Sequence, residues 1–309
     1  MFPSRVIVLV LFLSVCNYCW CYNHHPTKLL ASKFPPDDDN TARSVLPTRR
    51  EALLAAAASS PLLFLPTSST FAAPDVESAS TILSDLPPRT YQQSTTRIFF
   101  CRHGETENNR LGRVQGARID PPLNPTGRLQ AQAMGDALLP VTPKTAWAHS
   151  PLQRAQKTAR IASSPSRRLH IVKDLQEIDF GDALEGTDIG LYRAKVTATY
   201  AAWAAGELDV RMAGGGETGR EVLDRAQSAV AALLALQTPN VVAVAHSSYL
   251  RVLLSYVGGI SLAEAATWKI RNCSIHVVDF DRTTGESKLV RVSEDRHLNS
   301  IAIPKAAVG

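Results

Sequence analysis

Residues 98–106 read Ile98-Phe99-Phe100-Cys101-Arg102-His103-Gly104-Glu105-Thr106. In this stretch four apolar residues, enough for a short buried strand, run directly into a polar cluster. Two more stretches have the same order: residues 146–149 lead into 150–154, and residues 241–245 lead into 246–248. Amphipathic segments of helix length lie between these runs. The alternation predicts an α/β fold, a Rossmann-like three-layer α/β/α sandwich with a mostly parallel central sheet.

The spacing of apolar residues and of turn formers also sets the bounds of the expected elements. Strands are expected at residues 97–101, 145–149, 169–172, 241–245 and 274–280. Asn124 and Pro125 are expected to begin a helix over residues 125–138, and Ser150 and Pro151 to begin another that runs to about residue 163. Two further helices are predicted by core-facing stripes at three- and four-residue steps, formed by Ile189, Tyr192, Val196, Tyr200 and Trp203, and by Val222, Ala226, Val230 and Leu233. A hairpin that ends in residues 288–292 is expected to close one sheet edge.

Composition excludes several classes of protein. With 309 residues, 20% charged and 45% hydrophobic, the chain is neither fibrous nor collagen-like nor globally disordered. The net charge is +5, and +3 without residues 1–72, which is too small to indicate a nucleic-acid partner. No apolar run reaches the roughly 18 residues of a bilayer span, so no membrane span is expected in the mature chain. Three of the five cysteines lie within residues 1–21, which leaves too few for a disulfide framework.

The first 94 residues are expected to be a targeting leader and a linker in front of a single catalytic domain at residues 95–309. Arg5 and the apolar run 6–15 predict a signal peptide over residues 1–33. Residues 31–36 then resemble the cleavage motif that opens transit peptides in algae with secondary plastids, although three aspartates at 37–39 depart from the acid-poor norm. Residues 34–73 are therefore expected to be a plastid transit segment. Residues 74–94, rich in Ser, Thr and Pro from position 78 onward, are predicted to be a linker.

Residues 49–72 resemble a twin-arginine signal with a small-residue cleavage site, which would direct the protein to the thylakoid lumen. The alternatives are an alanine-rich transit helix that ends in the stroma, and secretion.

The three polar clusters are expected to share one crevice, because ligands of open α/β sheets bind beyond the carboxyl ends of the strands. Arg102 and Arg154 offer forked donors for an anionic oxygen group, and a helix that starts at residue 150 would aim its amides at the same place. The predicted ligand is a phosphate. His103 could then attack phosphorus, with His246 nearby and a carboxylic acid to protonate the departing alcohol.

The residue that supplies this acid is left open by spacing alone. Glu177 is the candidate, with Asp174, Asp179, Asp182 and Glu185 as rivals. Four other histidines are expected to satisfy local hydrogen bonds, since their spacing suits no metal site: His149, His170, His276 and His297.

Taken together, these motifs resemble the histidine phosphatase superfamily, also called the phosphoglycerate mutase family, over about residues 97–280. The residues that carry the resemblance are Arg102-His103-Gly104-Glu105-Thr106, Asn109, Gln115-Gly116, residues 120–123, Gly127, residues 150–155, Thr158-Ala159, Glu177, Gly181, Glu185-Gly186, Gly215-Gly216-Glu217 and His246. The resemblance implies that His103 becomes a phosphohistidine and that Glu177 is the general acid and then base. It further implies that Arg102, Arg154, His246 and Asn109 bind the phosphoryl group, with no metal and no cofactor. Asn109 could instead cap a turn.

The chain departs from the family pattern at Ser247-Ser248, where two glycines are commoner, and at Leu184, where tryptophan is common. Neither change removes a charged or nucleophilic group. The sequence therefore predicts a metal-independent phosphoric monoester hydrolase acting on a small phosphorylated metabolite.

Two other functions remain. One is mutase-type phosphotransfer, which would need a paired-arginine insertion that residues 178–245 lack. The other is a phosphate-binding protein that has lost turnover. The natural substrate and the oligomeric state stay open.

Overall fold

The computed structural model describes residues 83, 85–91, 94–299 and 301. The predicted signal peptide and transit segment lie outside these residues, as does the first part of the predicted linker. Within the described part of the chain, no helix is both long and apolar enough to cross a bilayer.

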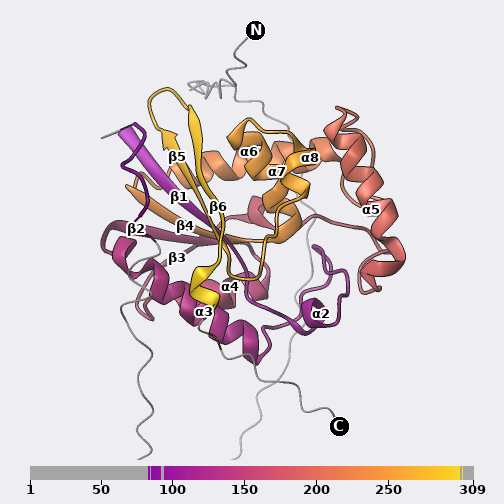
Figure 1. The fold of residues 1–309 in the computed structure, drawn as a ribbon, viewed down its shortest axis with the longest axis horizontal. Helices are drawn as coiled ribbons and strands as arrows, with labels where there is room; N and C mark the ends of the chain where they lie inside the picture. The colour runs from indigo at the N-terminus through magenta and orange to yellow at the C-terminus, as the bar shows by residue number, and fades with distance from the viewer. Residues whose placement is uncertain (1–82, 84, 92–93, 300, 302–309) are drawn as a thin grey trace, which may run out of the picture. The chain divides into compact units, whose positions relative to one another are not determined.

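A six-stranded sheet forms the centre of the domain (Figure 1). Its strands are β1 (Thr95–Arg102), β2 (Thr145–His149), β3 (Leu169–Ile171), β4 (Asn240–Ala245), β5 (Ile275–Asp281) and β6 (Ser287–Glu294). Their order is β3-β2-β4-β1-β5-β6, with the first four parallel and β5 and β6 antiparallel. The five predicted strands and the closing hairpin are confirmed to within a few residues.

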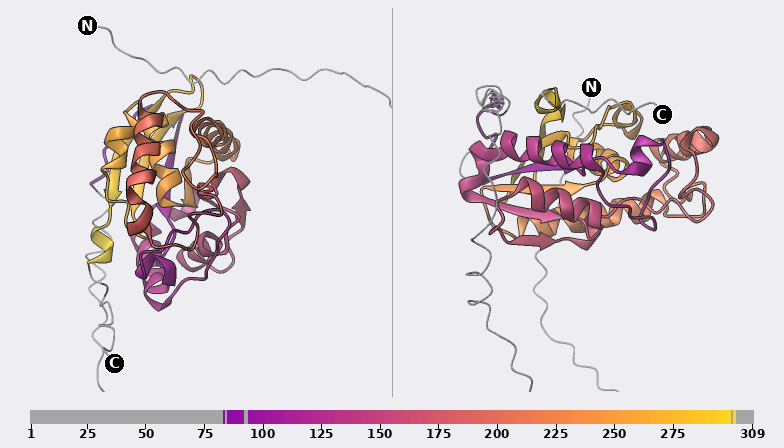
Figure 2. Two further views of the ribbon diagram at one scale, coloured as in Figure 1. Left: turned by 90° about the vertical axis from the view of Figure 1, so that its right-hand side faces the viewer. Right: turned by 90° about the horizontal axis from the view of Figure 1, so that it is seen from below.

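Helices cover both faces of the sheet, which confirms the three-layer sandwich (Figure 2). A hydrophobic core lies on each face of the sheet. The side chains of β1 alternate between the two cores, because successive residues of a strand point to opposite faces. Phe99 and Cys101 pack with α3 (Pro125–Leu138) and α4 (Gln153–Ala162). Ile98 and Phe100 pack with α6 (Gly219–Leu234) and α7 (Ser247–Gly258). The remaining helices are α2 (Glu107–Arg110), α5 (Ile189–Ala204) and α8 (Leu262–Ala266).

The two helix starts predicted from the sequence have different outcomes. Asn124 caps α3 by accepting a hydrogen bond from the Gly127 amide, with Pro125 as the first helical residue, as expected. The predicted start at Ser150 is wrong, because α4 begins at Gln153. The amide of Ser150 instead donates to Val244, which extends the strand ladder past the end of β2, so this residue stays outside the helix.

The described part of the predicted linker packs against the domain. Leu83 is buried, and the Arg89 guanidinium donates to the Pro239 carbonyl (2.8 Å) and the Asn240 side chain (2.6 Å). The Thr90 amide donates to a carboxylate oxygen of Asp279 (2.9 Å). These contacts hold the segment beside the amino ends of β1 and β4.

The strand order places the three polar clusters side by side. β4 lies between β1 and β2, parallel to both, with Ala245 paired to Arg102 and Val244 paired to His149. Residues that directly follow these strands therefore meet at one edge of the sheet, as expected for an open α/β sheet.

Candidate active site

His103 and His246 face each other at the carboxyl ends of β1 and β4. Their ring centroids are 5.0 Å apart, with an angle of 53° between the ring planes. Both residues are buried. Burial, followed by the positive charges of Arg154 and Arg102, holds the pKa of His103 well below its usual range. Burial and Arg154 act in the same direction on the pKa of His246, so both imidazoles are neutral at pH 7.

A hydrogen bond fixes which nitrogen of His103 can react. Its Nδ1 atom lies 2.7 Å from the Gly104 carbonyl oxygen, which can only accept, so Nδ1 carries the proton. The lone pair is therefore on Nε2, and a neutral imidazole with a free lone pair is a nucleophile. Gly104 packs tightly in turn, because a Cβ atom there would lie 2.4 Å from the Gly127 carbonyl oxygen.

Two arginines adjoin the histidines. Arg102 ends β1 and donates from Nη1 to the Ile270 carbonyl (2.8 Å). Arg154, in the first turn of α4, is fully buried and binds Asp120 (3.0 Å) and the carbonyls of Gly116 and Ile119. Burial and two neighbouring guanidinium groups lower the pKa of Arg102 to about 10, which still leaves it charged at pH 7.

Three buried nitrogens of this cluster lack a partner among the described residues. They are Nε of Arg102, Nε of Arg154 and Nδ1 of His246. A buried N–H without an acceptor costs free energy, and an anion can repay that cost at a cationic site. The cluster therefore has the donor chemistry of an oxyanion site.

Glu177 precedes α5 in the chain and lies against the first turn of α7, directly beside this cluster. One carboxylate oxygen accepts from the amides of Ile178 (3.0 Å) and Tyr249 (2.8 Å), and the other accepts from the amide of Ser248 (3.3 Å). Because His246 is the N-cap of α7, the helix start brings the acid and the second histidine together. The negative charge of Glu177 also acts on both Arg102 and Arg154.

The rival carboxylates have other partners. Asp179 and Asp182 both bind the Arg118 guanidinium, and Asp182 is exposed. Glu185 accepts from the amides of three residues, Arg118, Ile119 and Phe180. The geometry thus favours Glu177 over these three as the acid.

Asn109, a predicted phosphate ligand, is the third residue of α2. It completes a capping box with Thr106 at the start of α2, so the turn-capping alternative is confirmed. Its side-chain oxygen also accepts from Asn272 (3.0 Å), which donates to the His103 carbonyl as well (3.0 Å). Asn272 therefore links Asn109 to the candidate nucleophile.

The expectation that the amides of α4 face the ligand is wrong. The amides of Gln153 (2.5 Å) and Arg154 (3.4 Å) point to the Asp120 carboxylate, which therefore occupies this helix start. Asp120 was quoted only as part of the motif at residues 120–123, with no role given to it. Asn272 escaped the sequence reasoning because it lies in a connecting segment and follows no periodic pattern. Ser150, quoted only as part of a motif, donates to or accepts from Nε2 of His246 at 2.7 Å.

Tyr200 of α5 and Ser248 of α7 lie near Glu177. The Tyr200 hydroxyl lies beside Ser248 and near the charges of Glu177 and Arg251. Burial raises the pKa of Tyr200 to about 12, so its phenol stays protonated. Ser247 receives a hydrogen bond from Arg251 (2.7 Å), so one of the two serines that replace glycine holds a neighbouring guanidinium.

Residues 98–293 match the family model of the histidine phosphatase superfamily (branch 1). The chain belongs to this superfamily. A metal-independent phosphoserine phosphatase of Arabidopsis thaliana is 30% identical over 190 residues, which cover 60% of this chain and 77% of the relative. A probable phosphoglycerate mutase, GpmB, of Proteus mirabilis is 31% identical over 213 residues, which cover 67% of this chain and 97% of the relative.

Solved structures in this superfamily have the same fold. The crystal structure of a putative alpha-ribazole-5'-P phosphatase from Escherichia coli is 26% identical, with a TM-score of 0.53 and coverage of 65% of this chain and 97% of that one. Its likeness and that of the two relatives support phosphatase or mutase activity. Among the residues that the structure describes, no group of three or more His, Cys, Asp and Glu side chains could hold a metal ion.

Proposed function

We propose that this superfamily member is a metal-independent phosphatase that hydrolyses a small phosphomonoester through a phosphohistidine. The observation that carries the proposal is the site itself: a neutral imidazole whose lone pair is on Nε2, beside two buried guanidinium groups with unpartnered N–H donors. Such a site stabilises the charge of a transferring phosphoryl group while leaving the nucleophile uncharged.

The reaction takes two displacements at phosphorus. The first displacement starts with Glu177 protonated: Nε2 of His103 attacks, the bond from phosphorus to the ester oxygen breaks, and Glu177 gives this proton to the leaving alcohol and becomes a carboxylate. In the second, water attacks the phosphohistidine, Glu177 takes a proton from that water, and inorganic phosphate leaves. Arg102, Arg154 and His246 hold the phosphoryl oxygens in both steps, and His103 returns to its starting state.

Mutase-type phosphotransfer is the second candidate, because the Proteus mirabilis relative is named a probable phosphoglycerate mutase. A mutase must retain its phosphorylated intermediate, which calls for basic residues that cover the site. Two of the basic residues between Glu177 and His246 make contacts elsewhere. Lys195 is exposed on α5 with its ammonium over the Tyr192 ring, and Arg211 pairs with Glu221 on the surface. This arrangement favours hydrolysis.

The test uses the purified full-length chain with 4-nitrophenyl phosphate in the presence of EDTA. We expect turnover that EDTA does not reduce and that His103→Ala abolishes. His276→Asn is the matched control, since His276 is also a buried histidine but lies on β5, where it accepts from Ser293 instead of joining the site. An inert wild-type chain would support the binding-protein alternative, and activity retained in His103→Ala would refute the nucleophile.

A second assay separates hydrolysis from phosphotransfer. The enzyme receives 3-phosphoglycerate with a trace of the bisphosphate, and released phosphate is compared with 2-phosphoglycerate formed. Phosphate release is expected to dominate. Predominant isomerisation would replace the phosphatase proposal with the mutase.

We further propose that the enzyme acts in a plastid, on the basis of the bipartite leader at residues 1–73. A fusion of residues 1–94 to a fluorescent protein, expressed in an alga with secondary plastids, should accumulate inside the plastid. Replacing Arg49 and Arg50 by lysine should keep the fusion in the stroma if the twin-arginine segment directs it to the lumen. Secretion of the fusion would contradict the plastid proposal.

A further inference from the structure

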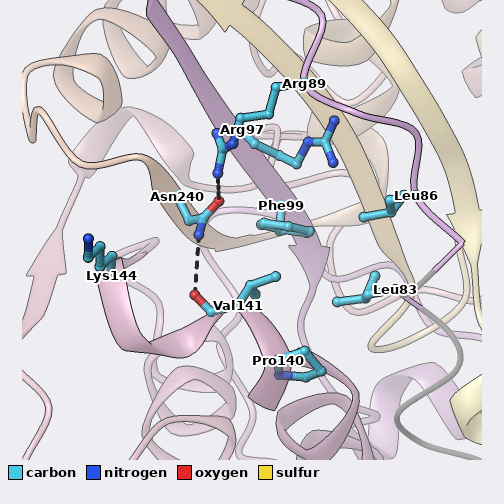
Figure 3. Close-up of a pocket in the computed structure, with 9 residues that line it drawn as sticks. All are labelled: Leu83, Leu86, Arg89, Arg97, Phe99, Pro140, Val141, Lys144 and Asn240. Atoms are coloured by element: carbon cyan, nitrogen blue, oxygen red, sulfur yellow. Dashed lines mark hydrogen bonds between the residues drawn. The ribbon is translucent and has the colours of Figure 1, made fainter. Parts of the chain in front are cut away.

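A cavity lies toward the amino ends of β1 and β4, away from the histidines that follow their carboxyl ends (Figure 3). Its volume is about 360 Å³, within the range of cavities that hold small molecules. Arg97 of β1 and Asn240 of β4, which are register partners, form part of its wall. Nothing in the proposed phosphatase reaction uses this cavity.

One part of the cavity is apolar. Phe99 lies in its centre, with Pro140 and Val141 on one side and Leu83 and Leu86 of the docked N-terminal segment on another. Phe99 and Leu83 are buried, so Leu86, Pro140 and Val141 are the side chains that offer a ring or a short hydrocarbon body a surface to bury. Such burial contributes about 25 cal/mol for each Å² removed from water.

The other part carries positive charge. Arg89, Arg97 and Lys144 line the cavity, and no acidic side chain is among its described lining residues. Asp279, behind the wall, binds Arg97 through two hydrogen bonds (2.7 and 2.9 Å). The charges in and behind the wall therefore sum to a positive excess.

Arg89 shows this excess most directly. Its guanidinium donates to neutral acceptors, the carbonyls of Thr95 and Pro239 and the side-chain oxygen of Asn240. Burial and then the charge of Arg97 lower the pKa of Arg89, which is the direction expected for a cation short of counter-charge. Lys144 is exposed at the rim and has no ion-pair partner in the described part of the chain.

We propose that this cavity binds a small organic anion, with its apolar body against Leu86 and Val141 and its carboxylate toward Arg89 and Lys144. The only described carboxylate that acts on Arg89 is Asp279, which Arg97 already binds, so the ligand carboxylate would supply additional counter-charge. Because the cavity lies at the opposite ends of the strands from the histidines, its ligand should not compete with the substrate phosphate.

The experiment is an isothermal titration of the full-length chain with 2-naphthoate, an aromatic carboxylate small enough for the cavity. We expect a single site with a dissociation constant between the micromolar and low millimolar range. 2-Naphthamide has the same shape without the charge and should bind about tenfold more weakly or worse. Equal binding of the two compounds, or no binding of naphthoate at 10 mM, would overturn the proposal.

Two variants locate the site. Lys144→Glu reverses a rim charge that supports no other contact, and should raise the dissociation constant of naphthoate about tenfold. Lys157→Glu, an exposed lysine of α4 outside this cavity, is the matched control and should leave it unchanged within twofold. Arg154→Met, in the phosphate site, should also leave naphthoate binding unchanged. Loss of binding in Arg154→Met, or no effect of Lys144→Glu, would assign naphthoate to the phosphate site or elsewhere and refute the cavity as its site.

Discussion

The arginines at the two ends of β1 differ in their hydrogen-bond partners. Near the amino end, Arg97 forks onto the carboxylate of Asp279, which has no exposed side-chain surface. At the carboxyl end, Arg102 donates from Nη1 to a backbone carbonyl, and its Nε has no partner among the described residues. One guanidinium is neutralised by a carboxylate, and the other keeps a donor without a partner among the described residues.

The difference separates stability from function. A buried ion pair contributes by completing its own hydrogen bonds, and breaking it leaves an uncompensated charge. A buried cation with unpartnered donors is costly in the free protein, and such groups concentrate where a ligand supplies the missing charge. Substitutions beside the candidate active site should therefore change the kinetics, and substitutions of buried groups outside it should change the stability. Four experiments measure these effects.

Glu177→Gln should produce the largest effect on turnover. Without the acid, an alkyl phosphate should be hydrolysed roughly 10² to 10⁴ times more slowly, because its alcohol must be protonated as it leaves. A nitrophenyl ester should lose much less, since its leaving group needs no proton. Steady-state kinetics on both esters measure the contrast, with Asp182→Asn as a control that removes a rival carboxylate. Equal losses on both esters would exclude Glu177 as the acid.

Arg154→Met should lower kcat/KM by about 10² to 10³, because its charge serves both bound substrate and transition state. Both the affinity for substrate and kcat are expected to fall. The matched control is Arg160→Met, an exposed arginine further along the same helix, which should keep wild-type kinetics. Wild-type kinetics in Arg154→Met would place this guanidinium outside the reaction.

Arg97→Met should destabilise the fold by about 3–5 kcal/mol, because it leaves the buried carboxylate of Asp279 without its cationic partner. Under conditions where the variant is folded, its kcat should equal that of the wild type. Urea unfolding measures the loss. Arg110→Met removes an ion pair to Glu107 whose two side chains are half exposed, and should cost no more than about 1 kcal/mol. Similar losses in the two variants would show that burial does not distinguish these pairs.

The pH dependence of stability should show a smaller effect. Burial lowers the pKa of His276 to about 3, while the unfolded chain keeps a value near 6.5. The unfolded state then binds more protons between these values, so stability is lost as pH falls below 6.5. Between pH 6.5 and 5.0, His276→Asn should lose about 2 kcal/mol less than the wild type in urea unfolding. Parallel stability curves for the two proteins would contradict the lowered pKa.

Local pattern predicted most of the architecture. The strands were readable because each is a short apolar run between polar segments, and α3 because Asn124 and Pro125 are both start signals. The start of α4 was not readable, because Ser150 carries the same kind of signal. The amide of Ser150 bonds to β4, and its hydroxyl bonds to His246, both far away in sequence.

For the candidate site, the polar residues that end the strands were predictable, since the alternation of strands and helices predicts a mostly parallel sheet whose carboxyl ends share one edge. The choice among the carboxylates was not readable from spacing. Glu177 stands apart only because the start of α7 binds its carboxylate while Arg118 binds Asp179 and Asp182. The role of Asp120 was not readable from the motif that contains it, and Asn272 belongs to no local motif.

The sequence by itself determined the three-layer sandwich, the superfamily, and the histidines and arginines at the strand ends, because periodicity and short motifs are local properties of the chain. Only the tertiary structure decided the tautomer of His103, the partners of each carboxylate and the cationic cavity near Arg89. These depend on which donors and acceptors from distant segments come within about 3 Å, and hydrogen bonds and charge balance are set at that distance.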